Sequence, residues 1–239
     1  MATRKATREA ETVLPATSSL PDIQVGLTQP YGPGFDYWEL HAVATGVTPL
    51  LMHNPASMWE GRTAGASTRG KNIPTPEDEA RQGAYILPTG QLYMPALALR
   101  NCFLEGCSRG DFRVGRKPLK VPLASGLIIP GEKLPLTRGG APIMDTDYEI
   151  SQMRAVIQRA GIIRSRPRIA EGWEIACTVL VDAALYRQPQ ALAQIWELFN
   201  FAGHTVGIGD YRPGRLGTYG QFKVAIAELA PLYEQLGCL

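Results

Sequence analysis

The amino-acid sequence predicts an α+β protein built on an antiparallel sheet, and two observations carry this prediction. Residues 37–44, 173–181 and 219–229 have the composition and two-residue alternation of strands, whereas the segments that begin at Pro95 and Pro189 follow a helical period. With 239 residues, of which 45% are hydrophobic, the chain is long enough for one large domain with an insertion.

The first half of the chain predicts a strand, a long loop, a hairpin and a helix, in that order. The first strand covers 37–44, and the polar, glycine-rich stretch 56–84 follows as a loop. A loop of this length in a compact domain is usually functional or disordered. Residues 85–94 predict a short hairpin, and Pro95 opens a helix that we expect to end near Gly106.

The second half repeats a strand–helix–strand order after a second insertion. Residues 109–145 are basic and then rich in proline and glycine, and the run 173–181 is the clearest strand of the chain. A helix begins at Pro189 and ends at Gly203, and the last strand covers 219–229. This β-α-β…β-α-β order favours a ferredoxin-like, or RRM-like, antiparallel sheet with two helices, a large inserted subdomain and a C-terminal glycine-rich loop.

The composition indicates one domain between two shorter segments. Residues 1–34 lack a steady period and predict a flexible N-terminal arm, and residues 233–239 predict a C-terminal tail. The single domain is then 35–232, with insertions at about 56–84 and 109–145.

Several classes of protein are disfavoured by the sequence. No apolar run approaches the length of a membrane span, and no apolar segment follows the basic residues at the N-terminus, as a secretory signal would require. The four cysteines lack metal-ligand spacing, so we expect free thiols in a reducing, cytoplasmic compartment, with no metal and no cofactor. These cysteines are Cys102, Cys107, Cys177 and Cys238.

Lysine and arginine residues gather in two clusters, at 109–120 and 154–168, although the formal net charge is only +2. Clustered cations on a near-neutral protein are typical of a surface that binds a phosphate backbone, but a single cluster is more often a solvated surface with paired charges. Because Pro167 follows Arg166, the backbone at Arg166 is predicted to be extended. The residues that we expect to contact nucleic acid here are Arg113, Arg116, Lys117, Arg164, Arg166 and Arg168.

The stretch 207–220 holds five glycines, together with Tyr211, Arg212 and Arg215. Glycine lets the backbone approach a ligand closely, and the arginine guanidinium binds phosphate oxygens in pairs. The spacing matches neither the Walker loop nor the dinucleotide fingerprint. A long hairpin loop that merely needs flexible turns is the alternative interpretation of this stretch.

Three segments of the chain, 47–50, 92–103 and 207–220, have the order and spacing of motifs from one known family. Together they resemble the RAMP superfamily, the RRM-like subunits of CRISPR ribonucleoprotein complexes. Residues 92–103 resemble the strand-to-helix motif of that family, residues 47–50 resemble the short motif after its first strand, and 207–220 is similar to its glycine-rich loop. The resemblance covers roughly 37–229 and implies a subunit that grips the backbone of a single-stranded guide RNA. It also implies partners: copies of itself, assembled side by side along the RNA, and other subunits of a CRISPR complex.

The resemblance also implies which residues bind the RNA. Arg100 at the start of the first helix would face it, as would two arginines of the glycine-rich stretch. The glycines there would admit the sugar-phosphate backbone, and Tyr211 could stack on an unpaired base. The loop residues carried over in this way are Gly207, Gly209, Tyr211, Arg212, Arg215, Gly217 and Gly220.

An enzyme is the less favoured interpretation. Of the histidines His41, His53 and His204, His53 is the candidate for RNA cleavage because it lies in the loop after the first strand, but no second residue is positioned to pair with it. Two other interpretations remain open. The chain could be a stand-alone single-stranded nucleic-acid-binding protein of a phage or mobile element, or a protein-interaction module on the same fold.

Overall fold

The computed structural model describes residues 26–55, 74–114, 116–157, 160–187 and 189–229. The predicted tail, most of the predicted N-terminal arm and the first part of the predicted 56–84 insertion lie outside these residues.

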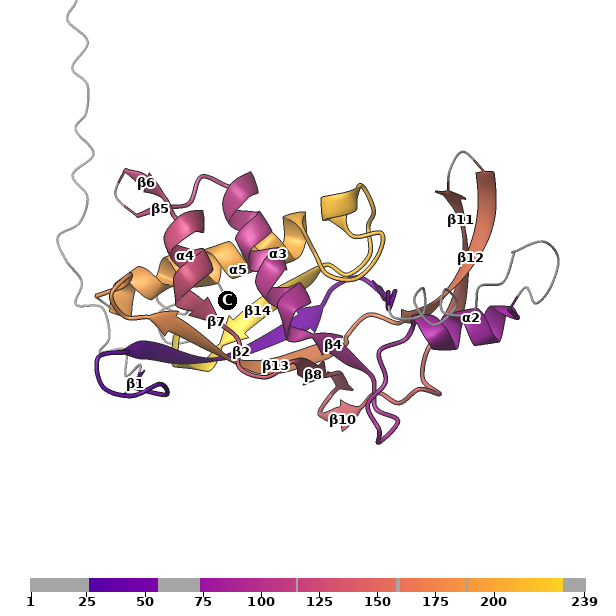
Figure 1. Ribbon diagram of the computed structural model, residues 1–239, viewed down its shortest axis with the longest axis horizontal. Coiled ribbons are helices and arrows are strands. Elements are labelled where there is room, and N and C mark those ends of the chain that lie inside the picture. Colours follow the sequence, from indigo (N-terminus) through magenta and orange to yellow (C-terminus); the bar gives the residue numbers. More distant parts are fainter. Residues whose placement is uncertain (1–25, 56–73, 115, 158–159, 188, 230–239) are drawn as a thin grey trace, which may run out of the picture.

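The predicted α+β class with antiparallel sheets is confirmed, and the main sheet is centred on β2 (Tyr37–Gly46). β13 (Glu174–Asp182) pairs with β2 along its whole length on one side, and β14 (Phe222–Ile226) pairs with it on the other. The short β7 (Leu127–Ile128) continues the sheet beyond β13, so that the order β14-β2-β13-β7 is antiparallel throughout (Figure 1). The remaining strands of this sheet are β1 (Leu27–Thr28), β9 (Thr137–Arg138) and β10 (Ala141–Pro142).

The helices α3 (Ala96–Arg109), α4 (Lys120–Gly126) and α5 (Ala193–Thr205) cover one face of this sheet (Figure 1). α5 follows a 3₁₀ turn, η1 (Pro189–Leu192). The alternation in β2 explains the sidedness of the sheet: Leu40, Ala42 and Ala44 are buried beneath the helices, whereas His41 is exposed.

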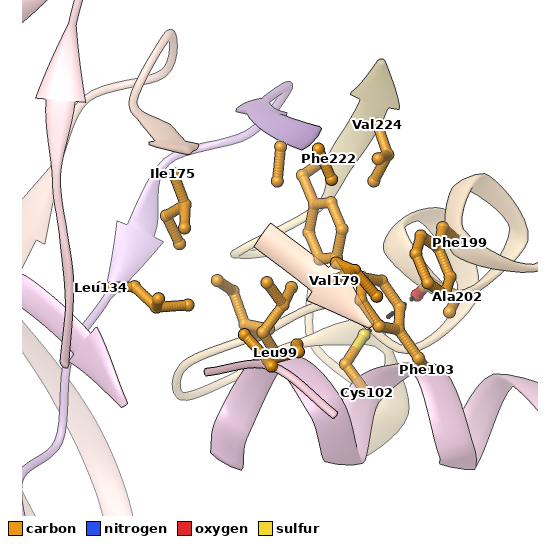
Figure 2. Close-up of a cluster of buried hydrophobic side chains, with 14 of the residues drawn as sticks. Leu99, Cys102, Phe103, Leu134, Ile175, Val179, Phe199, Ala202, Phe222 and Val224 are labelled. Carbon is orange, nitrogen blue, oxygen red and sulfur yellow. Dashed lines mark hydrogen bonds between the residues drawn. The ribbon is translucent and has the colours of Figure 1, made fainter. Parts of the chain in front are cut away.

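The core lies between α3, α5 and the sheet, as Figure 2 shows. Phe103 of α3 and Phe199 of α5 stack with ring centroids 3.7 Å apart, and Phe222 of β14 meets Phe103 edge-on. A Cβ on Gly106 would lie 2.6 Å from the Ala202 methyl, so this glycine sets the close spacing of the two helices. The prediction that α3 ends near Gly106 is therefore wrong: Gly106 serves packing, and the helix continues to Arg109.

The outer edge of β14 is closed by α5. Asn200 accepts a hydrogen bond from the Val224 amide at 2.9 Å and donates to the Val224 carbonyl at 3.1 Å, and Trp196 donates to that carbonyl at 2.9 Å. These side chains occupy backbone groups that an exposed edge strand would offer to another chain.

A second, three-stranded sheet projects from the main body (Figure 1). It consists of the hairpin β11 (Glu149–Ile157) and β12 (Ala160–Ile169), with β3 (Leu50–Leu51) paired to β12. The helix α2 (Pro76–Gly83) packs against β12 and begins where Thr75 caps the Asp78 amide. The extended backbone predicted at Arg166 is confirmed, since this residue lies within β12.

The two insertions contain more regular structure than the sequence predicts. Residues 76–83 form α2 where a loop is predicted, and residues 120–126 form α4 within the 109–145 insertion, for which no helix is predicted. Both helices are short, with eight residues in α2 and seven in α4, so a helical period is hard to recognise in either. The last strand is also shorter than predicted, because the chain turns through 219–221 before β14 and into η3 (Ala227–Leu229) after it.

Two small ladders complete the described structure. β4 (Tyr93–Pro95) pairs with β8 (Lys133–Pro135), and β5 (Arg113–Val114) pairs with β6 (Lys117–Pro118). Within the described ranges, no helix combines the length and the hydropathy that crossing a membrane would take. The described cysteines, Cys102, Cys107 and Cys177, are free thiols, as expected, and Cys238 lies outside the described residues.

Candidate nucleic-acid interface

The connection from α5 to β14, residues 206–221, is folded tightly against the protein itself. Gly207, Gly209 and Gly220 have φ of +68°, +78° and +67°, which favour glycine over other residues. A Cβ on Gly217 would overlap the Tyr211 carbonyl oxygen, and one on Gly220 would overlap the Ile208 carbonyl. The close approach that these glycines permit is therefore between segments of the protein backbone.

The tip of the connection is the 3₁₀ turn η2 (Pro213–Arg215), which contacts the C-terminal end of α3. Arg109 of α3 donates to the Gly214 carbonyl at 3.1 Å and to the Glu105 carboxylate at 2.8 Å. Arg212 lies 3.7 Å from the same carboxylate and donates to the Gly209 carbonyl. Partial burial acts to raise the pKa of Glu105, but the hydrogen bond from Arg109 and the surrounding positive charges hold this pKa below its usual value.

The base of the connection is joined to the β11–β12 hairpin. The Arg166 Nε lies 2.6 Å from Asp210 Oδ2, and the guanidinium lies 5.3 Å from the centre of the Tyr211 ring. The Tyr211 hydroxyl donates to the Arg154 carbonyl, and Tyr211 itself has a φ of +49°. With only 12% of its side chain exposed, Arg166 offers little surface to a ligand.

The other two β12 arginines are held by carboxylates. Arg164 donates to Glu79 of α2 at 2.8 Å, and Arg168 pairs with Glu149 of β11. Partial burial acts to raise the pKa of Glu79, but its hydrogen bonds from Arg164 and the Ser165 amide leave this pKa lowered. These pairs resemble the solvated, charge-paired alternative for this cluster more than an open row of cations.

Arg100 lies on α3 but is engaged by the end of α4. Its Nε donates to the Leu127 carbonyl at 3.0 Å, and its Nη2 donates to the Ala124 carbonyl. These oxygens belong to the last turn of α4 and the residue after it, where a cation is favourable. The guanidinium therefore stabilises a helix end within the protein.

A basic edge remains accessible at the C-terminal end of α3. Arg113 follows α3 in β5 and pairs with Asp111, Arg116 is exposed, and Arg215 is exposed on η2. The contact between Arg109 and Gly214 joins the start of the 109–120 cluster to the 207–220 stretch. In Figure 1 the β5–β6 ladder and the yellow connection flank α3 on its two sides. We define the basic edge as Arg109, Arg113, Arg116, Arg212 and Arg215. The Lys117 side chain lies outside the described residues.

Arg109 and Glu105 were missing from the residues that the sequence singled out as a site. Their spacing of four residues on a predicted helix is the signal that could have found this pair. Its importance comes from Arg212, which approaches Glu105 from a distant part of the chain.

The open face of the main sheet offers little to an unpaired base. The outward residues of β2 are Glu39, His41, Val43 and Thr45, and none of these is aromatic. His41 is hydrogen-bonded to Glu228, which raises the pKa of His41. The open face of β2 therefore presents no aromatic side chain on which an RNA base could stack.

His53 lies after β3, near the joint between the two sheets. Partial removal from water lowers the pKa of His53, and the charge of Arg166 lowers it further, while Asp210 acts in the opposite direction. The backbone carbonyl of His53 accepts a hydrogen bond from the Tyr85 hydroxyl. Within the described part of the chain, no hydrogen bond to the His53 imidazole ring is found. No group of three or more potential metal ligands occurs in those same ranges.

Neither the comparison with protein-family models nor the search of curated proteins finds a match for this chain.

Proposed function

We propose that the chain is an RNA-binding, RAMP-like subunit with a ferredoxin-like sheet, which grips the backbone of a guide or other single-stranded RNA and assembles side by side along it. The order of the elements supports the ferredoxin-like part of the proposal. A strand and helix (β2, α3) are followed by two neighbouring strands (β7, β13), a second helix (α5) and a last strand beside the first (β14).

The observation that carries the RNA-binding part is the basic edge. Arg109, Arg113 and Arg116 come from one segment and Arg212 from another, and the contact between Arg109 and Gly214 brings the two segments together. The carboxylates that hold them, Glu105 and Asp111, are on the same edge. Arginines already fixed in direction by such contacts can present their remaining N–H groups to phosphate oxygens.

The basic edge suits contacts with the RNA sugar-phosphate backbone better than recognition of a base sequence. Arginine contacts to phosphates provide affinity and register but carry no direct sequence information. We therefore expect binding that depends strongly on salt and weakly on the RNA sequence.

A pair of triple variants tests this proposal. The first variant, Arg113→Ala/Arg116→Ala/Arg212→Ala, removes three arginines of the basic edge. The matched control, Arg138→Ala/Arg187→Ala/Lys223→Ala, removes the same charge from other parts of the described surface. The affinity for a fluorescent single-stranded RNA is measured by anisotropy over a series of salt concentrations.

The edge variant is expected to bind RNA more weakly than the control, and the slope of log affinity against log salt should flatten by about 0.7 for each phosphate contact removed. Thermal unfolding of both variants checks that the fold is retained. Equal affinities and equal slopes for the two variants would remove the basic edge from the interface, and no measurable affinity of the unmodified protein would overturn RNA binding altogether.

A further inference from the structure

Leu216, at the end of η2, is a fully exposed apolar side chain on a rigid turn. Its relative exposure is 102%, and its backbone has a left-handed φ of +62°, which is unusual for leucine. The turn is held by hydrogen bonds from the Leu216 amide to Pro213, from Gly217 to Arg212, and from Gly214 to Val206. Strained residues that the surroundings hold in place are concentrated at binding sites, so Leu216 is a candidate contact residue.

A pocket of about 500 Å³ lies at the opposite end of α3. It is bounded by the start of α3, by β4 and β8, and by the segment before β8. Its apolar lining includes Leu97, which is 62% exposed, with Ile129 and Tyr93. A single leucine side chain fits within this volume and would cover the exposed part of Leu97.

The charges beside the two features are complementary. Arg215 is exposed immediately before Leu216, and Glu132 is exposed in the lining of the pocket. The cations of that lining are already engaged: Arg100 donates to carbonyls, and Lys133 lies 5.3 Å from the centre of the Tyr93 ring. Glu132 is therefore the charged side chain of the pocket that an incoming arginine would meet.

The positions of the two features prevent them from meeting within one molecule. Arg109, at the C-terminal end of α3, contacts the turn that carries Leu216, whereas Ala96, at the other end, lines the pocket. The helix has 14 residues and so spans about 21 Å. A projection at one end and a pocket at the other make a head-to-tail contact, which repeats from copy to copy.

We propose that Leu216 of one copy inserts into the pocket beside Leu97 of the next copy, where Arg215 faces Glu132. This inference rests on the assembly part of the proposed function and does not need RNA to be the ligand. It assigns Arg215 to the contact between copies, while the other arginines of the basic edge remain available to phosphates.

Disulfide trapping tests the contact directly. Chains of all 239 residues that carry Leu216→Cys or Leu97→Cys, each in a Cys238→Ser background, are mixed without RNA and oxidised mildly. We expect a disulfide-linked heterodimer, and a ladder of oligomers from one chain that carries both substitutions. The control replaces Leu97→Cys with Val121→Cys, on α4, where the native side chain is 77% exposed. Cross-linking no greater than that of the control would overturn the proposal.

A charge exchange provides the second test. Arg215→Glu and Glu132→Arg should each reduce self-association at least fivefold in sedimentation velocity, and the chain with both substitutions should recover it. Loss without recovery would contradict the pairing of these two residues.

The RNA affinity of Leu97→Ser, which alters the pocket and leaves the basic edge intact, is measured below the concentration of self-association and separates this inference from RNA binding. Unchanged RNA affinity with lost association supports the contact. Normal cross-linking by a protein that binds no RNA would overturn RNA binding and leave the contact supported, whereas normal RNA binding without cross-linking above control would overturn the contact alone.

Discussion

At the scale of single residues, the arginines and glycines of this chain mostly contact the protein itself. Arg166 is paired with Asp210, Arg164 with Glu79, and Arg100 with carbonyls at the end of α4. Pairing of this kind keeps the local charge around clustered cations close to neutral. Arg109, Arg113 and Arg212 of the basic edge are paired as well, with Glu105 and Asp111.

Gly217 leaves the least room for a side chain among the glycines of the described segments, because a Cβ there would overlap the Tyr211 carbonyl. Gly217→Ala is therefore expected to lower the free energy of unfolding by roughly 2–4 kcal/mol, the range of severe steric changes. Urea denaturation gives this value.

Gly131 provides the matched comparison for Gly217. It has a φ of +86°, but a Cβ added there would meet no atom within 4 Å, so Gly131→Ala adds backbone strain without a clash. We expect it to cost about 1 kcal/mol. Equal losses for the two variants would contradict a steric role for Gly217, and reduced RNA affinity of Gly217→Ala with unchanged stability would indicate a backbone that faces the ligand.

At the scale of elements, each helix has a task that its own sequence only partly reveals. α3 and α5 approach closely through Gly106 and Ala202, and α5 also closes the edge of β14. Glu79 of α2 accepts a hydrogen bond from the Ser165 amide at the edge of β12. The helices of this protein therefore bond backbone groups at the edges of the sheets as well as covering their faces.

Asn200→Leu tests the closure of the β14 edge. The substitution keeps the size of the side chain but removes its hydrogen bonds to the Val224 amide and carbonyl. We expect a loss of about 1–3 kcal/mol in stability, because partly buried backbone groups lose partners. Light scattering should also show faster aggregation on mild heating, since an exposed edge pairs with other chains.

Asn101→Leu is the control for that measurement, because Asn101 is exposed on α3. If the two leucine variants unfold and aggregate alike, the Asn200 side chain does not protect the strand.

At the scale of the whole molecule, the connection between α5 and β14 fixes the hairpin sheet to the main body. Asp210 and Tyr211 contact β12 and β11, and the Asp210 amide donates to the Leu51 carbonyl of β3. One short segment thus touches all three strands of the projecting sheet.

Asp210→Asn should loosen this joint. Removing the carboxylate leaves the mostly buried Arg166 guanidinium without its counter-charge, and we expect about 1–3 kcal/mol of lost stability. Hydrogen exchange should accelerate in β11 and β12 more than in β2 and β13, because the latter pair through the main core.

The exposed pair of Arg113 and Asp111 gives the comparison for the joint, since exposed pairs contribute little. Asp111→Asn should leave both stability and exchange near those of the unmodified protein. A uniform change of exchange across both sheets in Asp210→Asn would show that the ion pair does not act at the joint.

Local sequence patterns are sufficient to predict the class of the fold and several of its elements. The alternation over residues 37–44, the helix that starts after Pro95 and the extended backbone at Arg166 all follow from neighbours in the chain, so local patterns predict them. The short helix α2 escaped prediction because its apolar face is small and its partner, β12, lies far along the sequence.

Which charged residues are accessible depends on contacts between segments that are distant in the sequence. A cluster of arginines looks the same in sequence whether its members meet solvent or carboxylates, and the partners Glu79, Asp210 and Glu149 lie in separate segments. The same holds for the glycines of 207–220. A side chain is excluded at these positions by carbonyl groups that come close only in the folded chain. Periodicity is a local property and survives in the sequence, whereas pairing and close approach depend on contacts between distant segments, which exist only once the chain has folded.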